Sequence, residues 1–130
     1  MTQPPKLPKP LPGGKLDQLT DRTEVAGCSL AGGNFSEQTA SDVLFEQVLL
    51  RRINFSQTQL NRLRLADLRA EACEFAGAVW GTPRLRRVEF IGCRLLGVQW
   101  TDAQLDDVFL KECILDGAVW VRAVCKSVRF

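Results

Sequence analysis

Three segments decide the fold: CEFAGAVW from Cys73, CRLLGVQW from Cys93 and CILDGAVW from Cys113. Cysteine, glycine and tryptophan return at the same place in each segment, which gives a period of 20. A shorter period of five lies within it, because every fifth residue from Leu30 to Phe130 is apolar, at all 21 positions. Since the whole chain is 45% hydrophobic, chance does not account for this pattern, and a fixed internal period predicts a repeat architecture.

A period of five residues fits neither a helix nor a flat strand. A helix turns by about 100° per residue and would scatter these side chains around its surface, whereas a flat strand would point every second one outward. All of them face inward if each short extended segment is followed by a quarter turn, so that four segments close one coil. A second column, two residues before each central position, is also mostly apolar, and its chief exceptions are Gln38 and Thr58.

The repeats include GNFSE at 33–37, INFSQ at 53–57 and CEFAG at 73–77. This pattern resembles the pentapeptide-repeat family, whose consensus is a small residue, Asp or Asn, a central Leu or Phe, and two polar residues. The resemblance covers residues 28–130 and implies an all-β fold, a right-handed quadrilateral β-helix solenoid of about five coils. The second position is seldom Asp or Asn here, and the first is often Val, Ile or Leu.

The segment before the repeats has a different composition. Residues 1–14, MTQPPKLPKPLPGG, contain five prolines and two glycines and predict a disordered, flexible tail with some polyproline II structure. The stretch PKLP at 5–8 has the PxxP form of a peptide ligand, although the composition favours a leader without a binding role. We expect residues 15–25 to form the entry to the first coil and a cap on its open end. We therefore expect a tail and cap at 1–22 and a β-helix at 23–130.

Aromatic residues at central positions predict two ladders inside the coils. One wall of the interior should carry stacked phenylalanines and another should carry stacked tryptophans, both as packing rather than as a binding platform. The residues of these two ladders are Phe35, Phe55, Phe75, Trp80, Trp100 and Trp120.

Composition argues against several classes of function. The chain has no His and no Tyr, and no nucleophile–base arrangement is visible, so we expect no enzymatic activity, no cofactor and no small-molecule substrate. The cysteines fall on inward positions, and a spacing of 20 without His is weak for zinc, so we expect them to be buried and reduced, which favours a cytoplasmic location. No apolar stretch is long enough for a membrane span. A net charge of +2 gives no reason to expect a nucleic-acid partner.

Two groups of outward residues are candidate contact sites. Arg84, Arg86 and Arg87 form a basic cluster that could meet a phosphate or an acidic partner, although outward charges of mixed sign along a solenoid are more typical of solvated pairs between coils. The last coil and a half instead presents apolar outward residues. Those proposed for self-association are Phe109, Ile114, Val119, Val121 and Val124.

These apolar residues allow two interpretations. Either the natural protein continues beyond residue 130, or the C-terminal end stacks on a second copy to form a homodimer. The latter favours a non-enzymatic scaffold or protein–protein interaction module whose partner the sequence does not identify. The family resemblance also implies an alternative, because some members resemble duplex DNA and protect DNA gyrase or related topoisomerases from inhibitors. The near-neutral charge argues against that role.

Overall fold

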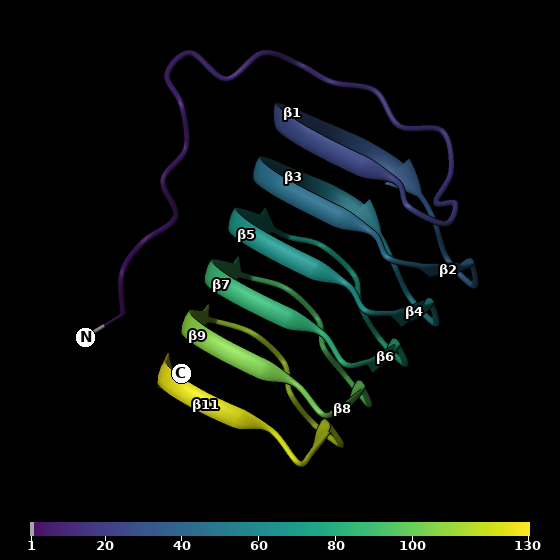
Figure 1. The fold of residues 1–130 in the computed structure, drawn as a ribbon, viewed down its shortest axis with the longest axis vertical. Coiled ribbons are helices and arrows are strands. Elements are labelled where there is room, and N and C mark those ends of the chain that lie inside the picture. The colour runs from purple at the N-terminus through teal and green to yellow at the C-terminus, as the bar shows by residue number, and fades with distance from the viewer. Residues whose placement is uncertain (1) are drawn as a thin grey trace.

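The computed structural model describes residues 2–130 as an all-β solenoid of about five coils, which confirms the predicted fold class. Its strands form two parallel sheets on different sides of a rod (Figure 1). The six-stranded sheet contains β1 (Glu24–Asn34), β3 (Leu44–Asn54), β5 (Arg64–Glu71), β7 (Arg84–Ile91), β9 (Gln104–Lys111) and β11 (Val124–Arg129). The five-stranded sheet contains β2 (Thr39–Ser41), β4 (Gln59–Asn61), β6 (Val79–Gly81), β8 (Gln99–Thr101) and β10 (Val119–Val121).

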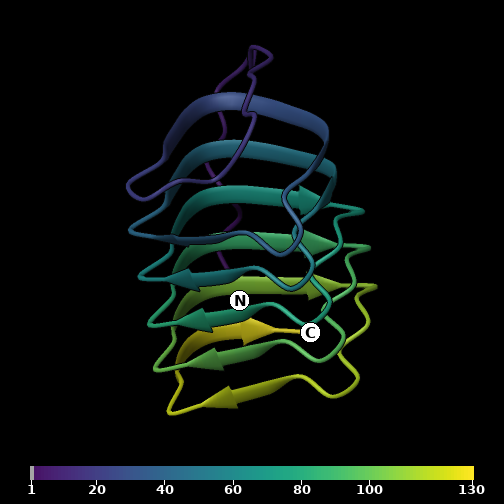
Figure 2. The same ribbon diagram turned by 90° about the vertical axis from the view of Figure 1, so that its right-hand side faces the viewer.

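Neighbouring strands pair in one constant register, each with the strand one coil away. Phe45 lies beside Leu65, Leu65 beside Leu85, and Trp80 beside Trp100. Residues 20 positions apart are therefore neighbours in adjacent coils. Figure 2 shows the coils stacked on one another. Central residues such as Leu65 and Trp100 are buried, so the five-residue period places a continuous apolar ladder inside the rod.

The corners of the coils have a left-handed backbone. Every fifth residue from Arg22 to Ser127 has a φ between +51° and +72°, and sixteen of these residues are not glycine. An L-residue in this conformation costs on the order of 1 kcal/mol. The corner is thus imposed by the packing of the coils rather than by local preference.

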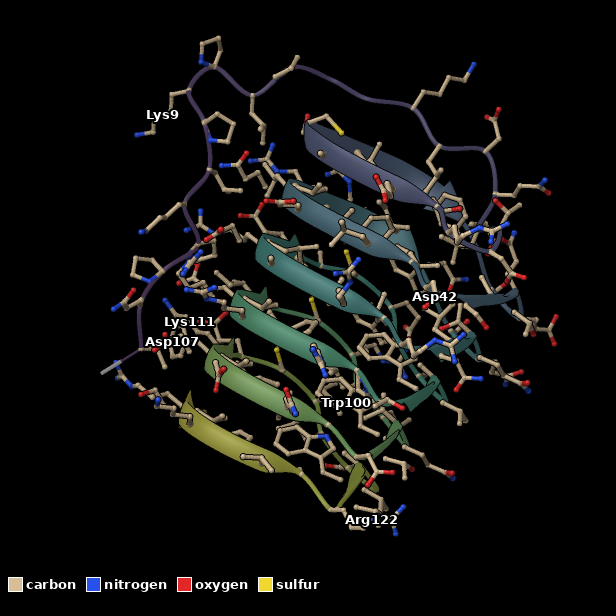
Figure 3. The ribbon with its side chains drawn as sticks, in the orientation of Figure 1. Lys9, Asp42, Trp100, Asp107, Lys111 and Arg122 are labelled. Atoms are coloured by element: carbon tan, nitrogen blue, oxygen red, sulfur yellow. The ribbon has the colours of Figure 1, made fainter. Side chains whose placement is uncertain are left out.

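The aromatic ladders form parallel stacks within the interior. Phe55 stacks on Phe35 and on Phe75 with ring centroids 5.4 and 5.3 Å apart. Trp100 stacks between its two neighbours of the tryptophan ladder, with centroids 4.9 and 5.2 Å away (Figure 3). Trp120, in the last described coil, is half-buried because no other described residues cover it as a further coil would.

The indole N–H groups of this ladder differ in their partners. Trp80 Nε1 donates to Thr58 Oγ1 at 3.4 Å, and Thr58 Oγ1 in turn donates to the carbonyl of Phe55 at 2.9 Å. Trp100 Nε1 and Trp120 Nε1 are buried without a partner among the described residues. Thr58, an exception in the apolar column, therefore satisfies one of three buried donors.

Residues 15–23 close the N-terminal end of the rod. Leu19 is buried and Leu16 packs against the interior of the first coil. The backbone N–H of Leu19 donates to Gln38 Oε1 at 2.7 Å, and Asp21 Oδ1 accepts from the N–H of Ser41 at the edge of β2. Gln38, the second exception in the apolar column, thus binds the cap.

Residues 2–14 follow one side of the rod, from the level of β9 to β1 (Figure 1). They form no strand, but the carbonyl of Pro12 and the N–H of Gly14 pair with Ser29 at the edge of β1. The sequence predicted a flexible tail here; the structure differs in giving this segment hydrogen-bonded contacts along the coils. Met1 lies outside the described residues.

We predict that Thr58→Val will lower the free energy of unfolding by about 2 kcal/mol, because the buried N–H of Trp80 loses its acceptor. Val98→Thr is the matched control, since residue 98 stands to Trp120 as residue 58 stands to Trp80. There the new hydroxyl meets an unpartnered indole, so we expect the free energy of unfolding to change by less than about 0.5 kcal/mol. Urea unfolding followed by tryptophan fluorescence measures both. Equal losses in the two variants would contradict this account of the ladder.

Candidate functional site

The last coil leaves the interior of the rod open. Leu115, Trp120 and Val128 occupy inward columns whose equivalents in the preceding coils are buried, yet each of them is half-exposed. Phe130 lies against Trp120, with ring centroids 5.8 Å apart, but is itself 71% exposed. Apolar surface that earlier coils cover is thus accessible at this end.

Outward residues of the same coil add to that surface. Val119 and Val121 flank Trp120 on β10, Val124 begins β11, and Ile114 lies on the segment between β9 and β10. All four are exposed, but only Val119 and Val121 share a side of the coil, so no single side of the rod presents all of them together. All four instead surround the C-terminal end of the rod. Phe109 differs, because it is half-buried and the Arg129 guanidinium lies 5.3 Å from its ring centroid.

The outer strand edges are paired at the N-terminal end of the rod and unpaired at the C-terminal end. At the N-terminal end, residues 12–23 pair with the outer edges of β1 and β2. At the C-terminal end, β10 and β11 are the outermost strands of their sheets, and no described residue pairs with their free edges. Unpaired strand edges beside apolar side chains are a template for association.

The thiols show the same gradient along the rod. Cys73 and Cys93 are buried, Cys113 is half-buried, and Cys125 is exposed because its inward position lies on the uncovered coil. Cys113 Sγ donates to the carbonyl of Phe90 at 3.2 Å. Hydrogen bonding with the Cys93 thiol lowers the pKa of Cys113 to about 7. All five cysteines are free, and residues 2–130 contain no group of three metal-ligating side chains.

The predicted basic cluster divides in the structure. Arg87 lies at a corner and donates to both carboxylate oxygens of Asp67, at 2.5 and 2.8 Å, so it is not available to a partner. Arg84 and Arg86 remain exposed, without a carboxylate partner among the described residues. The cluster therefore keeps two of its three predicted members.

Arg64, which lies outside the predicted cluster, joins these two. It lies beside Arg84 in the adjacent strand, and Arg64, Arg84 and Arg86 line a shallow hollow of about 300 Å³ whose floor includes Ala66. The spacing of Arg64 and Arg84, one full period of 20, is the sequence signal that identifies this neighbour.

Other arginines confirm the expected pairing between coils. Asp42 pairs with Arg62, and Asp102 with Arg122, each through two hydrogen bonds between corner residues 20 positions apart. These bonds lower the pKa of both carboxyl groups. Such exposed pairs neutralise the surface without forming a site.

The model of the family described as pentapeptide repeats matches residues 84–119, with eight copies of the repeat. The matched residues are pentapeptide repeats. The strand register and the left-handed corners continue on both sides of the matched segment, from β1 to β11. No curated protein matches the chain in sequence.

Solved structures of similar shape are also pentapeptide-repeat or resistance proteins by their descriptions. Rfr23, a pentapeptide-repeat protein from the cyanobacterium Cyanothece 51142, is 12% identical with a TM-score of 0.48; the match covers 85% of this chain and 89% of that one. A trypsin-treated variant of QnrB1, described as a plasmid-mediated fluoroquinolone resistance protein, is 16% identical with a TM-score of 0.39 and coverage of 85% and 78%. The described part of the chain contains no helix that could cross a bilayer.

Asp67 is the most enclosed charged residue of the surface, with 7% of its area exposed. The hydrogen bonds from Arg87 hold the pKa of Asp67 below its ordinary value of 3.8, against the opposing effect of burial, and the backbone N–H of Lys6 lowers it further. Because the folded pKa is below the unfolded one, the charged carboxylate stabilises the fold fully above pH 3.8. This contribution is lost as the pH falls through the folded pKa.

We predict that Asp67→Asn lowers the free energy of unfolding by about 2 kcal/mol at neutral pH, because a charged hydrogen-bonded pair is broken. The difference from the native chain should shrink as the pH falls below 3.8, where the native carboxylate also becomes neutral. Denaturant unfolding from about pH 7 to about pH 2.5 measures this difference. Asp106→Asn, which alters a neighbouring carboxylate at the rim of the arginine hollow, is the control and should change stability little at any pH. A pH-independent loss for Asp67→Asn would contradict the assignment.

Proposed function

We propose that this protein is a non-enzymatic interaction module that self-associates through its C-terminal coil. The observation that carries the proposal is the contrast between the ends of the rod. The N-terminal coil is closed by Leu16 and Leu19, whereas the C-terminal coil exposes Trp120, Leu115 and the flanking valines of β10. Uncovered apolar area and unpaired strand edges occur together there, and both are satisfied by the same kind of contact.

A second copy is the occupant that fits this end best. In a two-fold contact each chain would present the same coil, so that β10 meets β10 and β11 meets β11 in antiparallel pairs. Aromatic surface on Trp120 and Phe130 would then be covered by the equivalent rings. The side faces are well satisfied by ion pairs between coils, which gives them less to gain from burial.

The arginine hollow is a second contact surface in this proposal. Arg64, Arg84 and Arg86 lie near the middle of the rod, and end-to-end association would leave them accessible. Guanidinium groups bind carboxylates and phosphates through paired hydrogen bonds. We therefore propose an acidic protein surface as the partner of this hollow, with the cytoplasm as the compartment where reduced cysteines persist.

The alternative function, protection or inhibition of DNA gyrase through mimicry of DNA, has weaker support. Mimicry requires a continuous acidic surface, and the carboxylates of Asp42, Asp67 and Asp102 are each neutralised by an arginine. The net charge of +2 points the same way. A supercoiling assay with purified gyrase tests this alternative, and we expect no inhibition by this protein at micromolar concentration.

We predict that Val119→Asp will convert a dimer to a monomer, because it places a charge at the edge of the proposed contact. Val79→Asp is the matched control: Val79 is 41% exposed and Val119 47%, and the two occupy the same column, but Val79 lies in the middle of the rod. Light scattering over a concentration series measures the mass of each form. A native chain that is monomeric throughout would contradict the proposal, as would dissociation by both variants.

A further inference from the structure

The N-terminal tail is bound to the corners of the coils through its backbone. The N–H of Lys6 donates to Asp67 Oδ1 at 3.0 Å, and the N–H of Gln3 donates to Asp107 Oδ1 at 3.3 Å. Both carboxylates belong to one corner column, in which Arg87 lies between them. Figure 3 shows Asp107 beside the beginning of the tail. The tail runs along this column in the direction opposite to the winding of the coils.

The distance between the two acceptors along the rod equals the distance between the two donors along the tail. Asp67 and Asp107 are two coils apart, which at the inter-strand distance corresponds to about 9.6 Å along the rod. Gln3 and Lys6 are three positions apart, and a polyproline II segment of that length spans about 9.3 Å. A proline-rich segment laid along the rod therefore returns to the same orientation every second coil, where a carboxylate is present.

The composition of the tail agrees with this register. Proline has no N–H to donate, and the contacts come from non-proline residues with two prolines, Pro4 and Pro5, between them. Pro5 and Leu7 are half-buried, so the tail also has an apolar side toward the coils. By the same spacing, the next residue in the series, Lys9, would reach the corner at Gly27, which has no side-chain acceptor.

Hydrogen bonds from the coils fix the Asp67 carboxylate in place and leave it able to accept from a peptide N–H. Asp67 is held in place by both hydrogen bonds from Arg87, and its Oδ1 still accepts a third bond from the tail. In contrast, the corner carboxylates Asp42 and Asp102 face arginines on another side of the rod, where the tail does not pass. Two aligned acceptors beside an apolar surface select a peptide backbone with a donor at every third residue.

We propose that the corner column of Asp67, Arg87 and Asp107 is a binding site for proline-rich peptide in an extended conformation, and that residues 3–6 of the chain's own tail occupy it. Recognition depends on backbone N–H groups three positions apart and not on a particular side chain. A proline-rich segment of another protein would bind the same column by displacing the tail. This site is separate from the C-terminal coil, so the proposal does not depend on self-association.

The first test uses the full-length chain and Lys6→Pro, which removes one donor while preserving the polyproline II tendency. Heteronuclear ¹⁵N relaxation at the Leu7 amide measures whether the tail is held. We expect the native value to match that of the amides in β5, and expect Lys6→Pro and Asp107→Ala, which remove a donor and an acceptor, each to shift it to that of a mobile chain. Lys9→Pro and Asp106→Ala are the matched controls and should leave it unchanged. A mobile Leu7 in the native chain, or the same effect from the controls, would overturn the proposal.

The second test asks whether the column binds a peptide in trans. A synthetic peptide with the sequence of residues 2–12, TQPPKLPKPLP, is titrated into the Lys6→Pro chain, whose tail should be released. We expect amide shifts at Asp67 and Asp107 that saturate with the native peptide and are at least about tenfold weaker with the peptide carrying Pro in place of Lys6. Equal responses to both peptides, or no response up to millimolar peptide, would overturn the assignment.

Discussion

A left-handed backbone at every fifth residue is the constraint on which the rest of this structure depends. It turns the chain by a corner after each short extended segment, and so directs every central side chain inward. Because glycine fills few of these corners, each of the others costs on the order of 1 kcal/mol. The stacked interior of phenylalanine, leucine and tryptophan offsets that cost. The corner also aligns equivalent side chains along the axis, which is why Asp42 meets Arg62 and Asp67 meets Arg87.

The same constraint leaves the rod with two ends. A coil is satisfied by its neighbours, so the first and last coils each have an apolar face and a strand edge without a partner. Residues 12–23 resolve the first end by packing Leu19 over the interior and hydrogen-bonding the edge strands. At the C-terminal end, Trp120 is half-exposed within the described chain. The corner column at the side of the rod extends this logic, since aligned carboxylates offer acceptors to any backbone with matching spacing.

The five-residue period predicted the coils, the strand register and both aromatic ladders. It could do so because a buried column requires apolar residues at a fixed spacing, which is visible in the sequence. The left-handed corners were harder to predict, since most are Arg, Asp, Glu or Gln and carry no glycine signal. The exceptions Gln38 and Thr58 proved informative: each accepts a hydrogen bond that an apolar residue could not. The predicted basic cluster included Arg87 because its partner, Asp67, lies one coil away and not nearby in sequence. The path of the tail depends on backbone donors, which side-chain patterns do not show.

Amide hydrogen exchange of the native chain at low and high protein concentration tests the central proposal most directly, namely that the protein self-associates through its C-terminal coil. The account predicts that β10 and β11 exchange rapidly in dilute solution and become protected as the concentration rises, while β5 and β7 are protected equally at both concentrations. Exchange in β10 and β11 that is rapid at every concentration would contradict it, as would a gain in protection on the side faces instead.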